Sequence, residues 1–297
     1  MQNNSGLTRR GFVRGLAAAV AAPAIIPSSV LGAPDKVAAN SRINVCCIGM
    51  RNRGNQIMGS VLGDPRTQVV AICDVDSAIL QKSVDRARKH YKEKAGKDVE
   101  IKGYEDFREV MARKDIDAVV IATPDHTHAV ISVEAMKAGK DVFCEKPMTY
   151  SIKEGRMMAE AAKRYGRIVQ CGSQRRSEGG FIRMAELVQN GRIGKVHTVH
   201  VSVACSRPGA TQAFKAQPVP AGFNYDLWLG PAPYKPYDPA RCHYNFRFVS
   251  DFGTGEMGNW GAHFLDVCQM VLGMDHTGPV EVKPVAGERH ASGIYDV

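Results

Sequence analysis

The alternation of two kinds of segment between residues 43 and 171 constrains the fold more than any other feature of this chain. Short apolar runs rich in β-branched residues alternate with stretches of helical spacing. The runs are INVCCIG, TQVVAICD, DAVVIAT, KDVFCE and GRIVQCG, and the helical stretches are 76–95, 104–113, 127–138 and 151–165. Near-continuous apolar strands separated by helices indicate a parallel sheet that is covered on both faces. The sequence therefore predicts an α/β domain with a doubly wound, nucleotide-binding plan.

The turn after the first run, CIGMRNRG, nearly matches a dinucleotide-binding turn. Gly49 and Gly54 stand where the first and third glycines of G-x-G-x-x-G belong, and Arg51 replaces the second. Asp74 ends the second strand 20 residues after Gly54, where an acid binds the ribose hydroxyls of the cofactor. Its charge would repel a 2′-phosphate, so NAD is favoured over NADP. The alternative is a purely structural turn without a cofactor, because the glycine motif is broken.

The two arginines of this turn receive different interpretations. The second glycine normally lets the backbone approach the pyrophosphate, so the Arg51 side chain must point away or lie against a phosphate. We expect Arg51 close to the cofactor phosphates, because a phosphate tolerates a guanidinium better than other side chains. We expect Arg53 to be a solvated residue at the start of the helix.

The character of the chain changes after about residue 172. A helical stretch leads into KVHTVHVSVACSR, whose alternation predicts a strand with one buried and one free face. A region rich in Pro and Gly follows at 208–240, and GNWGAHFLDVCQMVLG has helical spacing. We expect residues 34–171 to form the nucleotide-binding domain and 172–297 an α+β substrate domain with an open sheet. The final residues leave a strand-like run without a closing element, so we expect this second domain to be incomplete.

The first 33 residues have the layout of an export signal. Arg9 and Arg10 precede the short apolar run LAAAVAAPAIIP, and small residues follow. The paired arginines predict a twin-arginine signal and a periplasmic or otherwise exported protein, the alternative being an uncleaved tail. The apolar run is too short to span a bilayer. The net charge is +9, but Lys and Arg are scattered among acids, which disfavours a nucleic-acid partner.

Polar residues follow the third and fourth strands, where open α/β sheets place their ligand crevice. Lys146 and Pro147 come directly after KDVFCE, so the Lys146 ammonium can reach into the crevice and polarise a substrate hydroxyl. His126 and His128 have a spacing that could suggest a metal, but no third ligand is evident and no metal is predicted. We expect His128 to be a cofactor-side or structural residue.

Taken together, these motifs resemble the Gfo/Idh/MocA oxidoreductases, the family of glucose–fructose oxidoreductase and inositol dehydrogenase. The resemblance covers about residues 43–297 and includes DLWLGP and YNFRFVSDFGTGEMGNWGAHFLD, which look like the exported branch of the family. The matching residues are Gly49, Gly54, Asp74, Thr123, Pro124, His128, Glu145, Lys146 and Pro147. The resemblance implies that Thr123, Pro124, His128 and Glu145 lie at the cofactor.

The same resemblance implies a catalytic set. It places Lys146 and His263 beside the reacting carbon, and it puts Asn259 where many members have an acid. An amide cannot take a proton, but it can still hydrogen-bond a substrate hydroxyl. Asp266 follows His263 by three residues on one helical face, so it could orient the imidazole or replace the missing acid. His243 and Arg247 alternate on an expected strand edge and could grip hydroxyls or a carboxylate.

The implied activity is NAD(P)-dependent oxidation or reduction of a sugar or cyclitol hydroxyl. Outside the cytoplasm free NAD is scarce, so we expect a tightly held cofactor that is recycled within one catalytic cycle. One alternative is a glycoside-cleaving or epimerising enzyme that uses NAD as a recycled catalyst. Another is a non-catalytic sugar-binding protein, which Arg51 and Asn259 favour and the Lys146–His263 pair opposes. We also expect a homo-oligomer formed through the sheet of the second domain.

Overall fold

The computed structural model describes residues 37–38, 41–96, 98–203, 214–283 and 285. The predicted export signal lies outside these residues. The chain divides into two compact units, Met1–Arg42 and Ile43–Val297, and the second contains the whole sheet and the site. Across the described residues, no helix has both the length and the apolar character required to cross a membrane.

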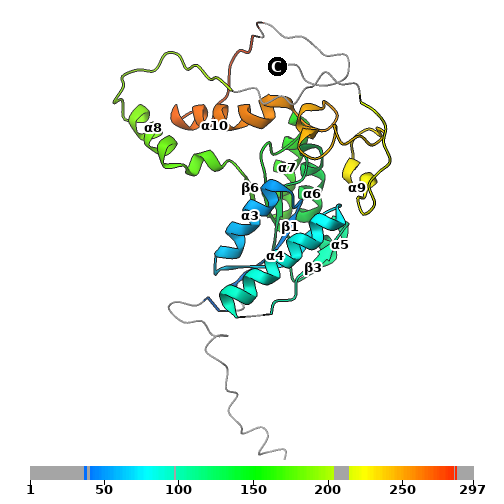
Figure 1. Ribbon diagram of the computed structural model, residues 1–297. Coiled ribbons are helices and arrows are strands. Elements are labelled where there is room, and N and C mark those ends of the chain that lie inside the picture. Colours follow the sequence, from blue (N-terminus) through cyan, green and yellow to red (C-terminus); the bar gives the residue numbers. More distant parts are fainter. Residues whose placement is uncertain (1–36, 39–40, 97, 204–213, 284, 286–297) are drawn as a thin grey trace, which may run out of the picture. The chain divides into compact units, whose positions relative to one another are not determined.

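Six parallel strands form one sheet in the order β3-β2-β1-β4-β5-β6 (Figure 1). They are β1 (Ile43–Ile48), β2 (Thr67–Cys73), β3 (Lys102–Tyr104), β4 (Ala118–Ile121), β5 (Asp141–Cys144) and β6 (Val169–Cys171). The strand order reverses between β1 and β4, and ligands bind outside the carboxyl ends of the strands at such a point. The predicted doubly wound domain is therefore present, although the three-residue strand β3 was not foreseen.

Helices cover both faces of this sheet. One hydrophobic cluster joins the central strands to α3 (Asn52–Gly63) and α4 (Ser77–Ala95) through Met58, Leu62 and Val84. A second cluster lies on the other face, where α5 (Phe107–Ala112), α6 (Asp125–Lys137) and α7 (Ile152–Tyr165) supply Val110, Ile131, Met136 and Met158. Because both faces are buried, the strands can be apolar throughout, which is the pattern that the sequence shows.

Side chains at the helix ends fix where the strand-end loops lie. The Asp76 carboxylate caps α4 by accepting hydrogen bonds from the amides of Ala78 and Ile79. A capping box between Ser151 and Glu154 begins α7. These caps set the path of the chain after β2 and before α7, and so position the residues that follow the strands.

The region after β6 packs a set of short helices beside the carboxyl ends of the strands. They are η2 (Gln174–Ser177), α8 (Gly179–Gln189), α9 (Tyr225–Leu229), η3 (Asn245–Phe248), η4 (Met257–Gly261) and α10 (Ala262–Val271). An aromatic cluster stabilises this region, with Phe223, Tyr225, Trp228, Tyr237, Phe246 and Phe252 buried against one another. The loop at 220–224 binds the Rossmann domain directly: Ser77 donates its amide to Gly222 O at 2.8 Å, and Asn224 donates to Val75 O at 2.8 Å.

The predicted open sheet of the second domain is not found among the described residues. Residues 195–203 form no strand, and Val199, Val201 and Val203 are exposed. The prediction of a strand there is therefore wrong for the part that the structure describes. A strand needs a neighbouring strand to satisfy its backbone groups, and the described part of this region supplies none. Oligomerisation through such a sheet stays a prediction.

Candidate active site

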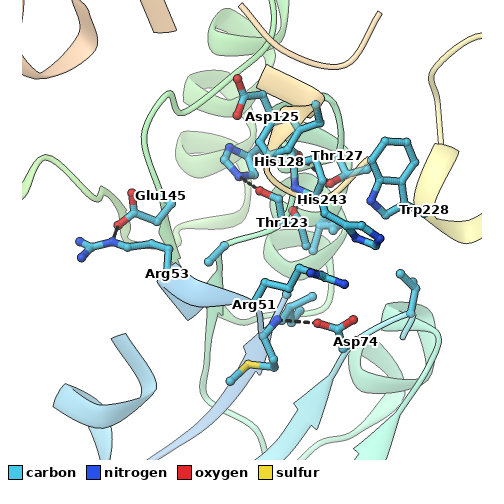
Figure 2. A pocket seen from close by; sticks show the side chains of 18 of the residues that line it. Arg51, Arg53, Asp74, Thr123, Asp125, Thr127, His128, Glu145, Trp228 and His243 are labelled. Carbon is cyan, nitrogen blue, oxygen red and sulfur yellow. Dashed lines mark hydrogen bonds and ion pairs between the residues drawn. The ribbon is translucent and has the colours of Figure 1, made fainter. Parts of the chain in front are cut away.

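A cavity of about 580 Å³ lies at the point where the strand order reverses, and most of the predicted site residues line it. Its size is typical of a small-molecule site. Figure 2 shows part of its lining. The predicted residues that line it are Gly49, Arg51, Asp74, Thr123, Pro124, His128, Glu145, Lys146, His243, Arg247, Asn259 and His263.

The glycine turn has the geometry that a dinucleotide requires. Gly49 has a φ of +83°, and a Cβ at this position would lie 2.7 Å from the amide of Thr123. A Cβ at Gly54 would lie 1.9 Å from Gly49 O, so no other residue fits there. The following helix α3 begins without a side-chain cap, which leaves its first amides available to a pyrophosphate.

Asp74 and Asp76 form an acidic end of the cavity, beyond β2. Asp74 accepts hydrogen bonds from the amides of Met50 at 2.6 Å and Asp76 at 2.9 Å. These bonds hold the carboxylate in place and leave lone pairs for two ribose hydroxyls. Burial raises the pKa of Asp74, and the hydrogen bond from Met50 opposes that shift. The turn and this carboxylate together fit a dinucleotide.

Arg51 lies at this acidic end. Its Nη2 is 3.4 Å from Asp76 Oδ2, and its side chain is about half exposed. In Figure 2 its side chain lies on the side of Asp74 and His243. The proximity of Arg51 to the cofactor phosphates stays a prediction, and the contact that the structure shows for this side chain is the one with Asp76.

Arg53 lies at the start of α3 and its side chain is 38% exposed, as expected, but it is also paired inside the cavity, which was not expected. Its Nε donates to Oε1 of Glu145 at 2.6 Å, and both residues line the cavity (Figure 2). Glu145 is only 4% exposed, and its other oxygen accepts the amide of Lys146 at 3.0 Å. A buried carboxylate needs such a partner. Glu145 therefore ties the start of α3 to the loop that carries Lys146.

Lys146 and Arg247 form a cationic end of the cavity. Lys146 follows β5, so β1 and β4 separate it from Asp74 in the sheet. Its Nζ donates to Asn259 O at 2.7 Å and approaches Asn259 Oδ1 at 3.4 Å. An ammonium has three donors, so one remains for a substrate oxygen. Burial is the main cause that lowers the pKa of Lys146.

Asn259 connects this ammonium to a carboxylate. Its Nδ2 donates to Glu256 Oε2 at 3.1 Å, while its Oδ1 faces Lys146. Residues Met257–Gly261 form a π-helix, a rare form that often marks a functional site. Glu256, three residues before Asn259 in the chain, thus places a carboxylate next to the Asn259 amide.

His263 begins the first turn of α10 and is 7% exposed. Burial lowers its pKa to about 4, and the charges of Lys146, Arg175 and Arg53 act in the same direction. The imidazole is therefore neutral near pH 7 and can accept a proton. Lys146 and His263 line one cavity, as the resemblance implied.

The predicted role of Asp266 does not fit the structure. Both of its oxygens accept hydrogen bonds from Arg176 Nε, at 2.9 and 2.8 Å, and it does not line the cavity. Arg176 also binds Asp275 at 2.8 Å. His263 and Asp266 do share a helical face, but the Asp266 carboxylate is bound by the guanidinium of Arg176, which belongs to η2. Asp266 therefore joins η2 to α10, and it acts on His263 through its charge, which opposes the lowering of the His263 pKa.

The two histidines at the start of α6 hold loops together. His128 is fully buried, and its two ring nitrogens lie 2.8 Å from Pro147 O and from Thr123 O. This contact joins the loops after β4 and β5, which supports a structural role for His128. The ring of His126 lies between Phe252 O and Trp228 O, at 3.2 and 2.9 Å. Within the described residues no group of three or more His, Cys, Asp or Glu is arranged to hold a metal.

His243 and Arg247 do not alternate on a strand edge. Arg247 lies in the 3₁₀ helix η3, and His243 precedes it with a φ of +57°. The pKa of His243 is lowered by burial and by the charge of Arg51, while Asp76 opposes this. His243 therefore lies toward the acidic end of the cavity, and its contact with a substrate stays a prediction. Arg247 forms the cationic end together with Lys146, and the charges of Asp125 and Glu256 act on it there.

Asp125 is a site residue that the sequence analysis missed. It is the first residue of α6, it lines the cavity and it is 5% exposed. Burial raises its pKa to about 7, although Arg247 and Lys146 act in the opposite direction. Its position directly after Thr123-Pro124, at a strand's carboxyl end, was a signal that could have identified it.

Two sequence models of one oxidoreductase family match the chain. The family's NAD-binding Rossmann fold matches residues 43–173, and its C-terminal alpha/beta domain matches residues 183–296. Together they span most of the chain, and both carry the name Gfo/Idh/MocA.

Relatives with assigned names support the same family. The chain is 31% identical over 134 residues to inositol 2-dehydrogenase of Salmonella paratyphi B, which covers 45% of this chain and 37% of that protein. It is 34% identical over 132 residues to myo-inositol 2-dehydrogenase of Thermotoga maritima, covering 43% and 38%. The match thus spans less than half the length of these relatives.

Among solved structures, the fold is similar to that of the WlbA dehydrogenase of Chromobacterium violaceum in complex with NADH and UDP-GlcNAcA. The TM-score is 0.60 at 22% identity, over 80% of this chain and 57% of that one. A second similar structure is an NAD-binding protein from Listeria innocua, with a TM-score of 0.53 at 20% identity over 77% and 52%. At these identities the likeness shows the fold alone.

Proposed function

Because the chain belongs to the Gfo/Idh/MocA oxidoreductase family, we propose that it transfers a hydride between NAD and a secondary hydroxyl of a sugar or cyclitol. The observation that carries this proposal is one cavity lined by Lys146 and His263 as well as by Asp74 and the glycine turn. Relatives named inositol 2-dehydrogenase support a polyhydroxylated ring as the substrate.

The side chains at the cationic end can perform the proton chemistry of alcohol oxidation. Bound NAD would supply the hydride acceptor. Neutral His263 would take the hydroxyl proton, since its pKa of about 4 keeps it unprotonated near pH 7. The remaining N–H of Lys146 would hydrogen-bond the same oxygen and stabilise its developing negative charge. In reduction, His263 would return the proton to the oxygen.

Asp74 supports NAD over NADP, because a carboxylate that accepts ribose hydroxyls repels a 2′-phosphate. We also propose export by the twin-arginine signal and a cofactor that is tightly held and recycled. The loop at 220–224, hydrogen-bonded to the β2–α4 connection, supports tight binding because it packs beside the acidic end. A cofactor loaded before export would be consistent with such a site.

The same cavity is compatible with two alternative functions. A glycoside-cleaving or epimerising enzyme would use the same Lys146–His263 pair and would oxidise its substrate only transiently. A non-catalytic sugar-binding protein would keep the fold without turnover. The Arg53–Glu145 pair and the Lys146–Asn259 contact disfavour it, because both hold the predicted catalytic lysine in one place.

The first experiment is to purify the full chain without added nucleotide, denature it, and identify the released small molecules by mass spectrometry. Stoichiometric NAD or NADH would support a loaded, recycling enzyme. Weak binding of added NAD, followed by NADH release with a polyol, would support an ordinary dehydrogenase. A protein that neither contains nor binds NAD would contradict the proposed function and favour the binding protein.

A further inference from the structure

The cationic end of the cavity contains two cations that have no close carboxylate partner. Among the described residues, no carboxylate lies within 4 Å of the charged nitrogens of Lys146 or Arg247, although both side chains line the cavity. By contrast, Arg53 at the same cavity is paired with Glu145 at 2.6 Å. Both side chains are partly buried. Two cations that face one cavity without a carboxylate close to either make that end of the cavity suited to an anionic ligand.

Lys146 already has a role in the proposed function, whereas Arg247 does not. The Arg247 guanidinium carbon lies 4.0 Å from the ring centroid of Tyr244 and 4.7 Å from that of Phe246. Its Nη1 donates to Tyr244 O. These contacts hold the guanidinium plane, and they leave the edge formed by Nε and Nη2 for a ligand. That edge matches a carboxylate, which it can bind with two parallel hydrogen bonds.

The surrounding charges do not neutralise Arg247. The Tyr244 phenol acts on it, and the two carboxylates that do so are Asp125 and Glu256, both at longer range. Asp125 is partly protonated near neutral pH, because burial raises its pKa to about 7. Glu256 accepts the Asn259 amide at 3.1 Å. Burial remains the largest influence on Arg247 and lowers its pKa, as expected for a cation without sufficient compensation.

We propose that the substrate of this site is a sugar acid, whose carboxylate binds Arg247 while a ring hydroxyl lies between Lys146 and His263. The proposal rests on the proposed function, because it names the substrate class of the same cavity. A phosphate ester is a poorer fit. It carries nearly two charges at neutral pH, and it needs more than one guanidinium edge.

The test compares ligands that differ only in charge. Binding of D-glucuronate, D-galacturonate, D-glucose, D-galactose, myo-inositol and glucose 6-phosphate to the NAD-loaded full chain is measured by isothermal titration calorimetry. Turnover is measured by the absorbance of the NADH that is formed. We expect at least one uronate to bind about 30-fold or more tighter than its neutral sugar, which is the size of effect that a charge-assisted hydrogen bond gives.

Variants then assign the preference to Arg247. Arg247→Gln should reduce the preference for the uronate, expressed as the Kd of the neutral sugar divided by the Kd of the uronate, by about 30-fold. Arg247→Lys should retain only part of this preference, since an ammonium lacks the paired edge. Arg156→Gln, on the exposed face of α7, is the matched control and should leave the ratio unchanged. Far-ultraviolet circular dichroism and NAD affinity check that each variant is folded.

Three results would overturn the substrate class. They are equal or tighter binding of the neutral sugars, tightest binding of the phosphate ester, or no binding of any uronate to the NAD-loaded protein. A loss of NAD affinity in Arg247→Gln would assign this arginine to the cofactor and would also overturn the proposal. Failure of the wild-type chain to bind NAD at all is a different result, because it contradicts the proposed function.

Discussion

The two ends of the cavity differ in charge and in how their side chains are held. At the acidic end, Asp74 is fixed by two backbone amides that belong to the turn and to its own loop. At the cationic end, Lys146 is fixed by Asn259, which lies 113 residues away in the chain. The acidic end is therefore built from local structure of the Rossmann domain. The cationic end depends on the packing of the later helices against it.

This difference assigns different tasks to the two ends. Carboxylates accept hydrogen bonds from hydroxyls, so the acidic end suits the ribose of the cofactor. Cations and a neutral imidazole stabilise negative charge and accept a proton, so the cationic end suits the reacting oxygen. Changes at the cationic end should affect kcat most, and changes at the acidic end should affect cofactor binding.

The largest effect is expected from Lys146→Met. Removing the donor to the reacting oxygen should lower kcat/KM about 1000-fold, as the loss of one preorganised electrostatic contact does in other enzymes. NAD affinity should change little, because Asp74 and the turn are untouched. Steady-state kinetics with Lys153→Met, an exposed lysine on α7, as the control would check this. Retention of more than a tenth of the activity would show that Lys146 does not contact the oxygen.

His263→Gln should lower kcat/KM about 100-fold, because general-base catalysis is lost. The pKa of His263 is lowered to about 4, so the base is neutral above that pH and is lost only as the pH falls through 4. The acid limb of the wild-type rate profile should therefore lie near pH 4 in a pH-jump assay. A limb near 6.5, unchanged in His263→Gln, would assign the base to another group.

Asp125→Asn should change how stability depends on pH. Burial raises the pKa of Asp125 from 3.8 to about 7, so between these values the folded state holds a proton that the unfolded state has released. Stability from this group is present below pH 4 and is lost as the pH rises through 7. Relative to wild type, the variant should gain ~2 kcal/mol in unfolding free energy between pH 5 and pH 8. Urea titrations at both pH values measure this. An equal difference at both would indicate that Asp125 is already ionised at pH 5.

The smallest effect is expected at the acidic end. Asp74→Ser should weaken NAD binding about tenfold, because one charged acceptor of the ribose hydroxyls is lost. The same variant should bind NADP relatively better, since repulsion of the 2′-phosphate is removed. Fluorescence of Trp228 and Trp260, which both line the cavity, offers a readout for both cofactors. Tighter NADP than NAD binding by the wild type would instead point to Arg51 as a phosphate ligand.

The fold of the Rossmann domain could be predicted because its signals are local. Apolar runs and helical spacing identified five of the six strands, and the glycine turn identified the crevice. The strand expected at 195–207, of which the structure describes 195–203, shows the limit of such reasoning. Alternation describes which face of a strand would be buried, but a strand also needs a partner, and the described residues contain none for it.

The sequence by itself determined where the cofactor turn lies and most of the residues that reach the cavity, but it did not identify Asp125 or Arg53 and it wrongly included Asp266. The positive φ of Gly49, the close approach of Gly54 to Gly49 O, and the position of Asp74 at the end of a strand follow from short-range geometry. Only the tertiary structure decided the partners of the charged side chains. Arg53 pairs with Glu145 across 92 residues, and Arg176 takes Asp266 across 90 residues. Charge pairing depends on which side chains meet in space, and no local pattern encodes that meeting.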